Sequence, residues 1–354
     1  MLKYTKSASG FLTHRYSNVL KKCALLNLSM LAAALPAYAA DNPASPSNAP
    51  VTQVVTTNMN NHLFEAINKQ LRSSDLGHKS TTSSNNMWHG VSVWADTYYG
   101  YTKLDDRPDT YGFDIDGMGG IVGVEKQMTA HMKMGAGYQY DAADVDGHKR
   151  KNKARSNTGF IYAEYQPNAM FLNGMIAYGQ STYRDKNKAP DQTIRGKYHA
   201  DMLSMQALTG YKYSWNTMDI TPQMGLRYNY IKRHGYKDGA DQYVSGKNMD
   251  SFTGLLGVSM SKDLYWHECL KFRPELYGGL SYDFISDRDN AVVNVAGGED
   301  YVVKGKRLNR MGFQIGAGIT SELTENLTMN LSYAGNFRKD FYDNSGMLGL
   351  SYAM

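Results

Sequence analysis

Apolar and polar residues alternate over long stretches of this 354-residue chain. Between residues 219 and 230, every even-numbered residue is apolar or aromatic, and every odd-numbered residue is polar, charged or glycine. With few exceptions the same period of two recurs in 131–141, 270–284, 310–319 and 326–333. Side chains of a β-strand point alternately to its two faces, so the pattern predicts strands with one apolar and one polar face.

The length and the ends of these runs favour a membrane barrel over a soluble sandwich. The alternating runs reach 10 or more residues, whereas strands of soluble proteins average about 5–6 residues. Tyrosines gather near the ends of several runs, as at Tyr98, Tyr138 and Tyr228, where membrane barrels carry aromatic girdles. The chain has no continuous apolar run of about 18 residues, which excludes a bundle of membrane-spanning helices. The fold class is therefore all-β, a transmembrane β-barrel.

Counting the runs gives about twelve antiparallel strands, joined alternately by long polar loops and short turns. Outer-membrane barrels place their long loops outside the cell and their short turns in the periplasm. An even number of strands then puts the start of the first strand and the C-terminus on the periplasmic side. The predicted strands cover residues 88–101, 113–125, 130–141, 157–166, 169–182, 200–214, 217–231, 250–262, 268–284, 307–320, 326–337 and 342–354.

A single helix is expected ahead of the barrel, over residues 51–75. An apolar residue recurs there at every fourth position, with polar residues between. About 22 residues of helix span roughly 33 Å, close to the thickness of a bilayer core, and the moderate polarity suits a polar lumen better than lipid. Residues 76–87 read as a linker and 88–354 as the barrel. The recurring apolar residues are Val55, Met59, Leu63, Ile67 and Leu71.

The N-terminal residues 1–39 read as a secretory signal peptide. They contain five of the 38 Lys and Arg residues and no Asp or Glu, which leaves 33 basic against 33 acidic residues in the rest. The two lysines at 21–22 precede an apolar stretch, and Ala37-Tyr38-Ala39 is a small-x-small cleavage site. Residues 40–50 read as a disordered stub. Since the net charge of +5 resides in the signal, a nucleic-acid partner is not expected.

Several local sequences, taken together and in this order, resemble the C-terminal translocator, or β-domain, of type V autotransporters. The resemblance covers the chain from about residue 51 to its end. It rests on the helix end Ile67-Asn68-Lys69-Gln70-Leu71-Arg72, Trp88 and Val93-Trp94 in the first strand, Gly117, Gly119, Gly120 and Gly123 in the second, Gly135-Ala136-Gly137-Tyr138 in the third, the strand at 220–228 with Pro222 and Tyr228, and alternating Leu348, Leu350 and Tyr352 in the last.

The resemblance implies a monomeric barrel in the outer membrane of a Gram-negative bacterium, with a helix in its lumen and a role in polypeptide export. It also implies handling by periplasmic chaperones and the barrel-assembly machinery, which reads the last strand; Leu348, Leu350, Tyr352 and Met354 would be that signal. Two features differ from the family pattern. Only residues 40–50 separate signal and helix, so no secreted passenger of its own is expected, and the final residue is Met354 rather than an aromatic.

Inward-facing charges are the candidate functional residues of the lumen. On the helix, Glu65, Lys69 and Arg72 are expected to pair with charges on the wall. Charges that pair with one another and fill the lumen are the simpler interpretation, because small barrels need their interiors filled; a polar channel for a passing chain is the functional one. The wall residues placed there are Asp116, Glu125, Glu164, Arg227, Arg273, Glu275 and Arg310.

Other chemistry finds little support in the sequence. Asn60-Asn61 is similar to the bond that some autotransporters cleave within the lumen, but the local match is loose. The histidines are scattered without ligand spacing, although His148, His199 and His234 lie near external loops; no enzyme, cofactor or metal site is expected. Residues 142–156 and 183–199 each carry five basic and two acidic residues.

Those basic loops keep a second class of function open. Outer-membrane lipid and lipopolysaccharide are the expected contacts, because basic side chains attract phosphates. The alternative to export is therefore a stand-alone barrel, either porin-like or a surface-binding adhesin, with no secretion role.

Overall fold

A computed structural model describes residues 51–77, 90–106, 111–188, 193–266, 270–294, 300–305 and 307–354. These residues belong to one compact unit, Ser45–Met354. The predicted signal peptide (1–39), the stub (40–50), Trp88 and most of the 76–87 linker lie outside the described residues.

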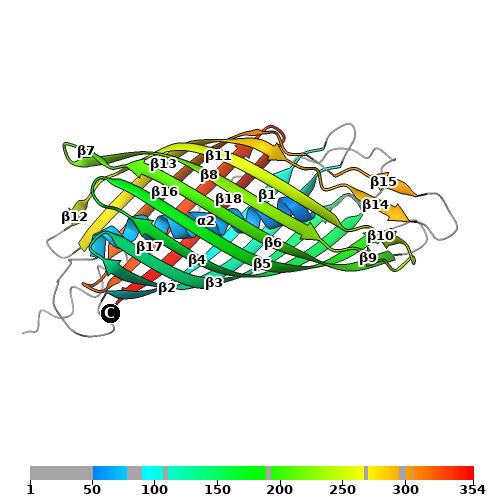
Figure 1. The fold of residues 1–354 in the computed structure, drawn as a ribbon, viewed down its shortest axis with the longest axis horizontal. Helices are drawn as coiled ribbons and strands as arrows, with labels where there is room; N and C mark the ends of the chain where they lie inside the picture. The colour runs from blue at the N-terminus through cyan, green and yellow to red at the C-terminus, as the bar shows by residue number, and fades with distance from the viewer. Residues whose placement is uncertain are drawn as a thin grey trace, which may run out of the picture. The chain divides into compact units, whose positions relative to one another are not determined.

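Twelve long strands of the described chain form a closed antiparallel barrel, as the sequence predicts (Figure 1). Each strand pairs with its neighbours in sequence, and the first and last strands pair along their whole length, from Ser92 opposite Ala353 to Leu104 opposite Phe341. The strands are β1 (Val91–Leu104), β2 (Phe113–Thr129), β3 (Met132–Gly147), β4 (Arg150–Tyr165), β5 (Met170–Lys188), β6 (Thr193–Tyr211), β8 (Met218–Arg233), β11 (Lys247–Ser261), β13 (Leu270–Ser286), β16 (Met311–Glu322), β17 (Leu327–Arg338) and β18 (Phe341–Ala353).

The two ends of the barrel differ (Figure 1). One end carries the C-terminus and two short strands, β7 (Tyr213–Trp215) and β12 (Leu264–Trp266). The other carries a separate small sheet of four short strands, built from two long connections. The end with the long connections is the external one. The small sheet consists of β9 (Tyr236–Lys237), β10 (Tyr243–Val244), β14 (Ala291–Asn294) and β15 (Tyr301–Val303).

Strands β3 to β6 extend much farther outward than the sequence pattern predicts. Residues 142–156 and 183–199, expected to be loops, are mostly strand. In these strand ends apolar residues such as Ala143, Val145 and Tyr183 are buried inside, and most charged residues face out. This is the reverse of the membrane-spanning part, where the apolar residues face out. Above the membrane the outer face meets water rather than lipid, so a search for apolar outward residues misses these strand ends.

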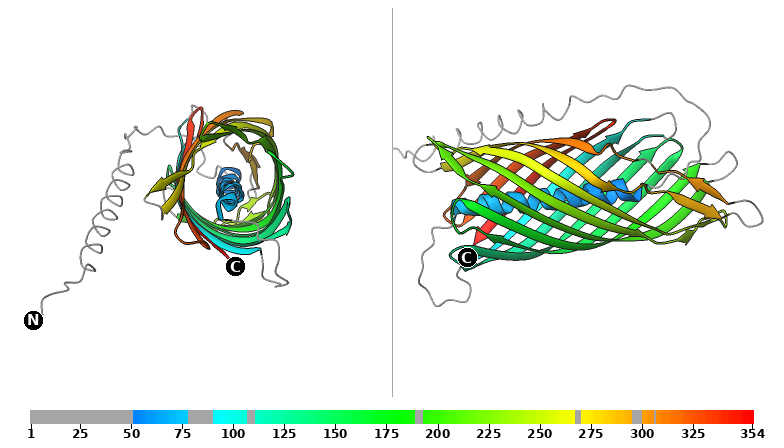
Figure 2. Two further views of the ribbon diagram at one scale, coloured as in Figure 1. Left: turned by 90° about the vertical axis from the view of Figure 1, so that its left-hand side faces the viewer. Right: turned by 45° about the horizontal axis from the view of Figure 1, so that its top comes forward.

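The helix α2 (Thr52–Gly77) runs inside the barrel (Figure 2), two residues beyond the predicted end at 75. All five residues of the predicted apolar stripe are buried. The helix begins at the external end, where Thr52 Oγ1 donates a hydrogen bond of 3.4 Å to the Tyr198 hydroxyl. It ends at the end that holds the C-terminus (Figure 1). No described helix is long and apolar enough to cross a membrane.

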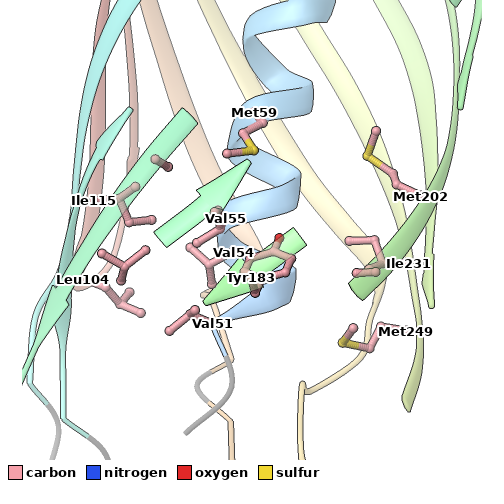
Figure 3. Packing of buried hydrophobic residues seen from close by; sticks show 14 of the residues in the cluster. Val51, Val54, Val55, Met59, Leu104, Ile115, Tyr183, Met202, Ile231 and Met249 are labelled. Atoms are coloured by element: carbon pink, nitrogen blue, oxygen red, sulfur yellow. The ribbon is translucent and has the colours of Figure 1, made fainter. Parts of the chain in front are cut away.

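Two buried apolar clusters anchor the helix along its length. The outer cluster packs Val51, Val54, Val55 and Met59 among side chains of the surrounding strands (Figure 3). The inner cluster surrounds the second half of the helix and includes Trp94, Tyr98, Ile121, Phe160 and Tyr162 of the wall. Burial of apolar surface therefore holds the helix mainly against β1 to β6 and β18, with Ile231 of β8 and Met249 of β11 added at the external end.

Candidate functional site

The candidate site is the lumen and the helix that fills it. At the external end, the connection after β13 folds over the first turn of α2. Gln53 N donates a hydrogen bond of 3.4 Å to Asp289 Oδ2, and Asp289 pairs with Arg233 of β8 at 3.4 Å. Burial raises the pKa of the Asp289 carboxyl, and Arg233 opposes that rise. A buried carboxylate at a helix N-terminus satisfies a free backbone donor and fixes the first turn in place.

Tyrosine side chains continue this outer layer. The hydroxyls of Thr56 and Tyr183 share a hydrogen bond of 2.6 Å. The Tyr183 ring stacks on that of Tyr198, and Tyr198 stacks on Tyr236, with ring centroids 4.8 Å apart in each case. The stack connects α2 through β5 and β6 to the small external sheet. Packed side chains thus join the helix, the wall and the small sheet at this point of the external end.

Asparagines form the middle layer of helix contacts. Asn58 donates to Asp343 Oδ1 of β18 at 3.0 Å. Asn60 donates to Ser204 Oγ and Asn229 Oδ1, each at 2.8 Å. These bonds connect the helix with opposite parts of the wall, so the helix is held on several sides at one level. Buried polar groups with partners specify a unique position, because any displacement leaves them unsatisfied.

Arg227 of β8 joins the wall to the helix through several contacts. Its guanidinium donates to Asn61 Oδ1 and, through two nitrogens, to Gln206 Oε1 at 3.0 and 2.8 Å. It also lies over the Phe64 ring, 4.1 Å from the centroid. The planar guanidinium, whose donors point in several directions, suits this combination of stacking and hydrogen bonding better than a lysine would.

Two ion pairs hold the periplasmic end of the helix. Lys69 pairs with Asp96 of β1 at 2.5 Å, and both side chains are buried. Arg72 pairs with Glu275 of β13 at 2.8 Å. Glu65 accepts a hydrogen bond of 3.4 Å from Asn336 of β17. The structure thus places all three charged helix residues of the sequence analysis against polar partners on the wall.

The helix does not fill the lumen evenly. One polar stripe of α2 is only half-buried and faces the wall of β8, β11, β13, β16 and β17. Two small cavities lie along it, of about 110 Å³ beside the second half of the helix and about 60 Å³ beside the first. The stripe consists of Gln53, Thr57, Asn61, Glu65, Asn68 and Arg72.

Two of the predicted lumen residues are placed wrongly by the sequence analysis. Asp116 is exposed on the outer face of β2 and accepts a hydrogen bond of 2.7 Å from the Tyr99 hydroxyl. Odd-numbered residues of β2, such as Glu125, face the lumen, so Asp116 cannot share that face. Arg310 is exposed and precedes β16. The strand begins one residue later, at Met311, so Arg310 is exposed to solvent ahead of the strand and is not a buried residue of the lumen wall.

Three of the other predicted wall charges face inward but pair with the wall itself. Glu125 accepts from the Tyr162 hydroxyl at 3.1 Å, and Glu164 pairs with Lys133 at 3.2 Å. Arg273 pairs with Asp263 in the turn before its own strand. These contacts match the simpler interpretation of lumen filling, whereas Arg227 and Glu275 reach the helix.

Three further residues that were not predicted, Asp96, Asp343 and Asp289, bind α2 directly. The parity of β1 and β18 would have placed Asp96 and Asp343 on the inner face, since Leu348, Leu350 and Tyr352 face outward. Asp289 lies in a connection with no strand pattern, so no periodic signal identifies it.

The histidines of the external end are only partly brought together. His234 Nε2 lies 2.8 Å from Asp201 Oδ2, and His234 N donates to the His199 carbonyl at 2.9 Å. His148 instead stacks on Tyr111, with ring centroids 4.5 Å apart. Among the described residues, no group of three or more His, Cys, Asp or Glu side chains could hold a metal ion.

Fold and lumen define the class, an outer-membrane β-barrel whose pore holds one helix of its own chain. Residues 93–334 match the family model of the autotransporter β-domain, and the chain belongs to this family. This confirms the resemblance stated from the sequence, and with it an outer-membrane location in a Gram-negative bacterium.

Similar proteins agree with that assignment. Outer membrane protein A of Rickettsia rickettsii is 25% identical over 319 residues, which cover 83% of this chain and 14% of that protein; its Rickettsia conorii counterpart is 24% identical, with 16% covered. This chain therefore spans about a seventh of the length of these relatives.

Solved structures of autotransporter translocators share the fold. The translocator domain of NalP from Neisseria meningitidis has a TM-score of 0.62 at 16% identity, covering 84% of this chain and 99% of that one. The transport unit of AIDA-I from Escherichia coli has a TM-score of 0.59 at 16% identity, covering 82% and 97%.

The Lys69–Asp96 pair depends on a glycine of the last strand. A Cβ at Gly349 would overlap Asp96 Oδ1 and lie 3.3 Å from Lys69 Nζ. We expect Gly349→Ala to displace the carboxylate and lower the free energy of unfolding by about 1–3 kcal/mol, measured by urea unfolding in lipid vesicles. Gly346→Ala on the same strand is the matched control, because a Cβ there meets no atom within 4 Å. Equal stability of the two variants would contradict the pair's role.

Proposed function

We propose that this barrel is a polypeptide translocator whose pore is closed by α2. The path of the chain supports this. The helix occupies the lumen from its external end, at Thr52, to the periplasmic end, beyond which the chain goes on to β1. Any segment that precedes Val51 in sequence therefore connects to the helix at the external mouth, as expected when an exported segment has passed through the pore.

The closed state of the pore is the second support. A helix with its side chains is about 10–12 Å wide, and the cavities found beside α2 in the described lumen are small, at about 110, 60 and 10 Å³. Spaces of this size hold a few water molecules. Ions would therefore pass only when the helix moves, and its ion pairs and hydrogen bonds oppose that movement.

The last strand is proposed to serve as the assembly signal. Leu348, Leu350 and Tyr352 are exposed on the lipid-facing side of β18, and Met354, also exposed, follows its end; β18 closes the barrel against β1. A strand with alternating lipid-facing apolar residues can be recognised before the barrel closes, because both its edges are then still free. The assembly machinery and periplasmic chaperones are the partners that this proposal implies.

Conductance in planar bilayers tests whether α2 closes the pore. We expect the intact protein to be nearly silent and a variant lacking residues 51–75 to open large, steady currents, because the lumen then contains only wall side chains. The double variant Lys69→Gln/Arg72→Gln should flicker between the two levels. A deletion variant that folds, as judged by heat-modifiable migration, yet stays silent would contradict a pore held shut by α2.

Access to an inserted tag tests translocation separately. An epitope placed at residue 45 should be cleaved by protease added to intact cells, since it precedes the external end of the helix. The same epitope in the periplasmic turn at 324–325 is the control and should stay protected. An epitope at 45 that is protected in intact cells but cleaved after the outer membrane is opened would argue against translocation, whatever the conductance.

Assembly can be tested on the outward face of β18. We expect Leu350→Asn/Tyr352→Ser to lower the amount of folded barrel in the outer membrane several-fold, and Met354→Phe to raise it, because the machinery would recognise apolar and aromatic outward residues. Met347→Leu changes an inward residue of the same strand and serves as control. Heat-modifiable migration of isolated outer membranes measures the folded fraction. Unchanged levels of folded barrel in both test variants would contradict recognition of β18.

A further inference from the structure

The external ends of β4, β5 and β6 present a dense group of basic side chains on the outer surface of the barrel. Each of these residues is exposed and faces away from the lumen, because the residues between them are directed inward. We name this surface the basic rungs. It consists of Lys151, Lys153, Arg184, Lys186, Arg195 and Lys197.

Strand register sets like charges directly opposite one another. Arg184 of β5 lies opposite Lys197 of β6 and, on its other side, opposite Lys153 of β4. Lys186 likewise lies between Arg195 and Lys151. Like charges in directly opposed positions destabilise a sheet. A pattern of this kind is tolerated best where an anion balances the charge.

Ion pairs within the protein neutralise only one side of the basic rungs. Lys151 pairs with Asp146 at 2.8 Å and Lys153 with Asp144 at 3.2 Å, both on β3. For the β5 and β6 members of the basic rungs, the described part of the chain offers no ion pair. Asp238, whose backbone bridges Gly196, uses its carboxylate to accept bonds from Ala240 N and Gln242 N in its own turn.

The geometry of the unpaired members suits a phosphate. Adjacent strands lie about 4.8 Å apart, and successive outward residues of one strand are about 6.6 Å apart. Arg184, Lys186, Arg195 and Lys197 therefore occupy the corners of a rectangle that one phosphate group can bridge. Arginine donates to phosphate oxygens in pairs, and lysine adds a mobile point charge.

The distance of the basic rungs from the hydrocarbon core of the membrane indicates which phosphate groups they would contact. On β5 the outward residues are apolar up to Tyr178, at the aromatic girdle, and Arg184 follows six residues later. Six residues rise about 20 Å along a strand, or roughly 15 Å along the membrane normal at the usual tilt. Ordinary headgroups extend only about 5–8 Å beyond the hydrocarbon core. The phosphorylated sugars of lipopolysaccharide extend farther, beside this surface.

The outward charges of the external end are also segregated by sign, with the basic ones on β4 to β6. The corresponding outward positions of β2 and β3 carry Asp114, Asp116, Asp144 and Asp146. A surface that only needed to be soluble would mix both signs. We propose that the basic rungs bind the phosphate groups of lipopolysaccharide and so orient the barrel in the outer leaflet, with β4 to β6 against the glycolipid.

Titration of the purified full chain in neutral detergent with lipopolysaccharide tests the proposal, with affinity measured by calorimetry. Arg184→Gln/Lys197→Gln should weaken binding at least tenfold. The matched control is Lys126→Gln/Lys262→Gln, which removes the same charge near the periplasmic end and should leave binding unchanged. Arg184→Lys/Lys197→Arg should retain most of the affinity, because the charge is kept.

Titrations with two other ligands distinguish the possible sources of phosphate. Lipopolysaccharide stripped of its phosphates should bind at least tenfold more weakly than the intact molecule, and inorganic phosphate at equal concentration should not bind. Equal binding of stripped lipopolysaccharide, or equal affinity of Arg184→Gln/Lys197→Gln and the intact chain, would overturn the proposal. Binding of inorganic phosphate as tightly as lipopolysaccharide would make this a free-phosphate site and overturn the lipid assignment.

A stability measurement guards against a folding artefact. Without lipopolysaccharide, Arg184→Gln/Lys197→Gln relieves repulsion between opposed cations, so its unfolding temperature should equal or exceed that of the intact chain. With lipopolysaccharide added, only the intact chain should gain stability. A variant that is less stable in both conditions would show that these cations stabilise the fold itself, and would contradict an anion-binding role.

Discussion

Every backbone donor and acceptor within a bilayer must find a partner inside the protein, and the rest of this structure depends on that constraint. The chain satisfies it by pairing β1 with β18 along thirteen residue pairs, from Ser92 to Leu104, so the sheet has no free edge. Closure at twelve long strands encloses a lumen too wide to be filled by wall side chains alone. Such a lumen can hold water or a segment of protein, and here it holds α2.

Apolar packing and polar contacts have different roles in positioning the helix. Its apolar stripe packs mainly against β1 to β6 and β18, which sets its side-to-side position. Layers of polar contacts from Asp289 at the external mouth to Glu275 near the periplasmic end set its depth and rotation. The stripe that faces β8 to β17 is left beside small cavities. A plug held this way is stable, yet it is joined to the wall mainly by polar groups that water could replace if the helix moved.

The outer surface follows a different rule at each height. Within the membrane it is apolar, at the girdle it is rich in tyrosine, and above it the charged residues separate by sign, acidic on β2 and β3 and basic on β4 to β6. Strand register amplifies this separation, since one strand's basic residues lie directly opposite those of the next. Charge that is balanced over residues 40–354 as a whole is thus unevenly distributed in space.

The sequence by itself determined the fold class, the number of strands, their order and the helix. Both signals, the alternation of apolar and polar residues and the apolar residue at every fourth position, are local properties of the chain. It also indicated that Lys69 and Arg72 lie in the lumen. Tertiary structure decided what those residues bind, since Asp96 and Glu275 come from strands far apart in sequence. It decided the face of Asp116, where a one-residue parity error reverses the assignment. It also decided that the expected basic loops are paired strands. Above the membrane the apolar residues of these strands face inward and the charged residues face outward, which is the reverse of the pattern used for the prediction.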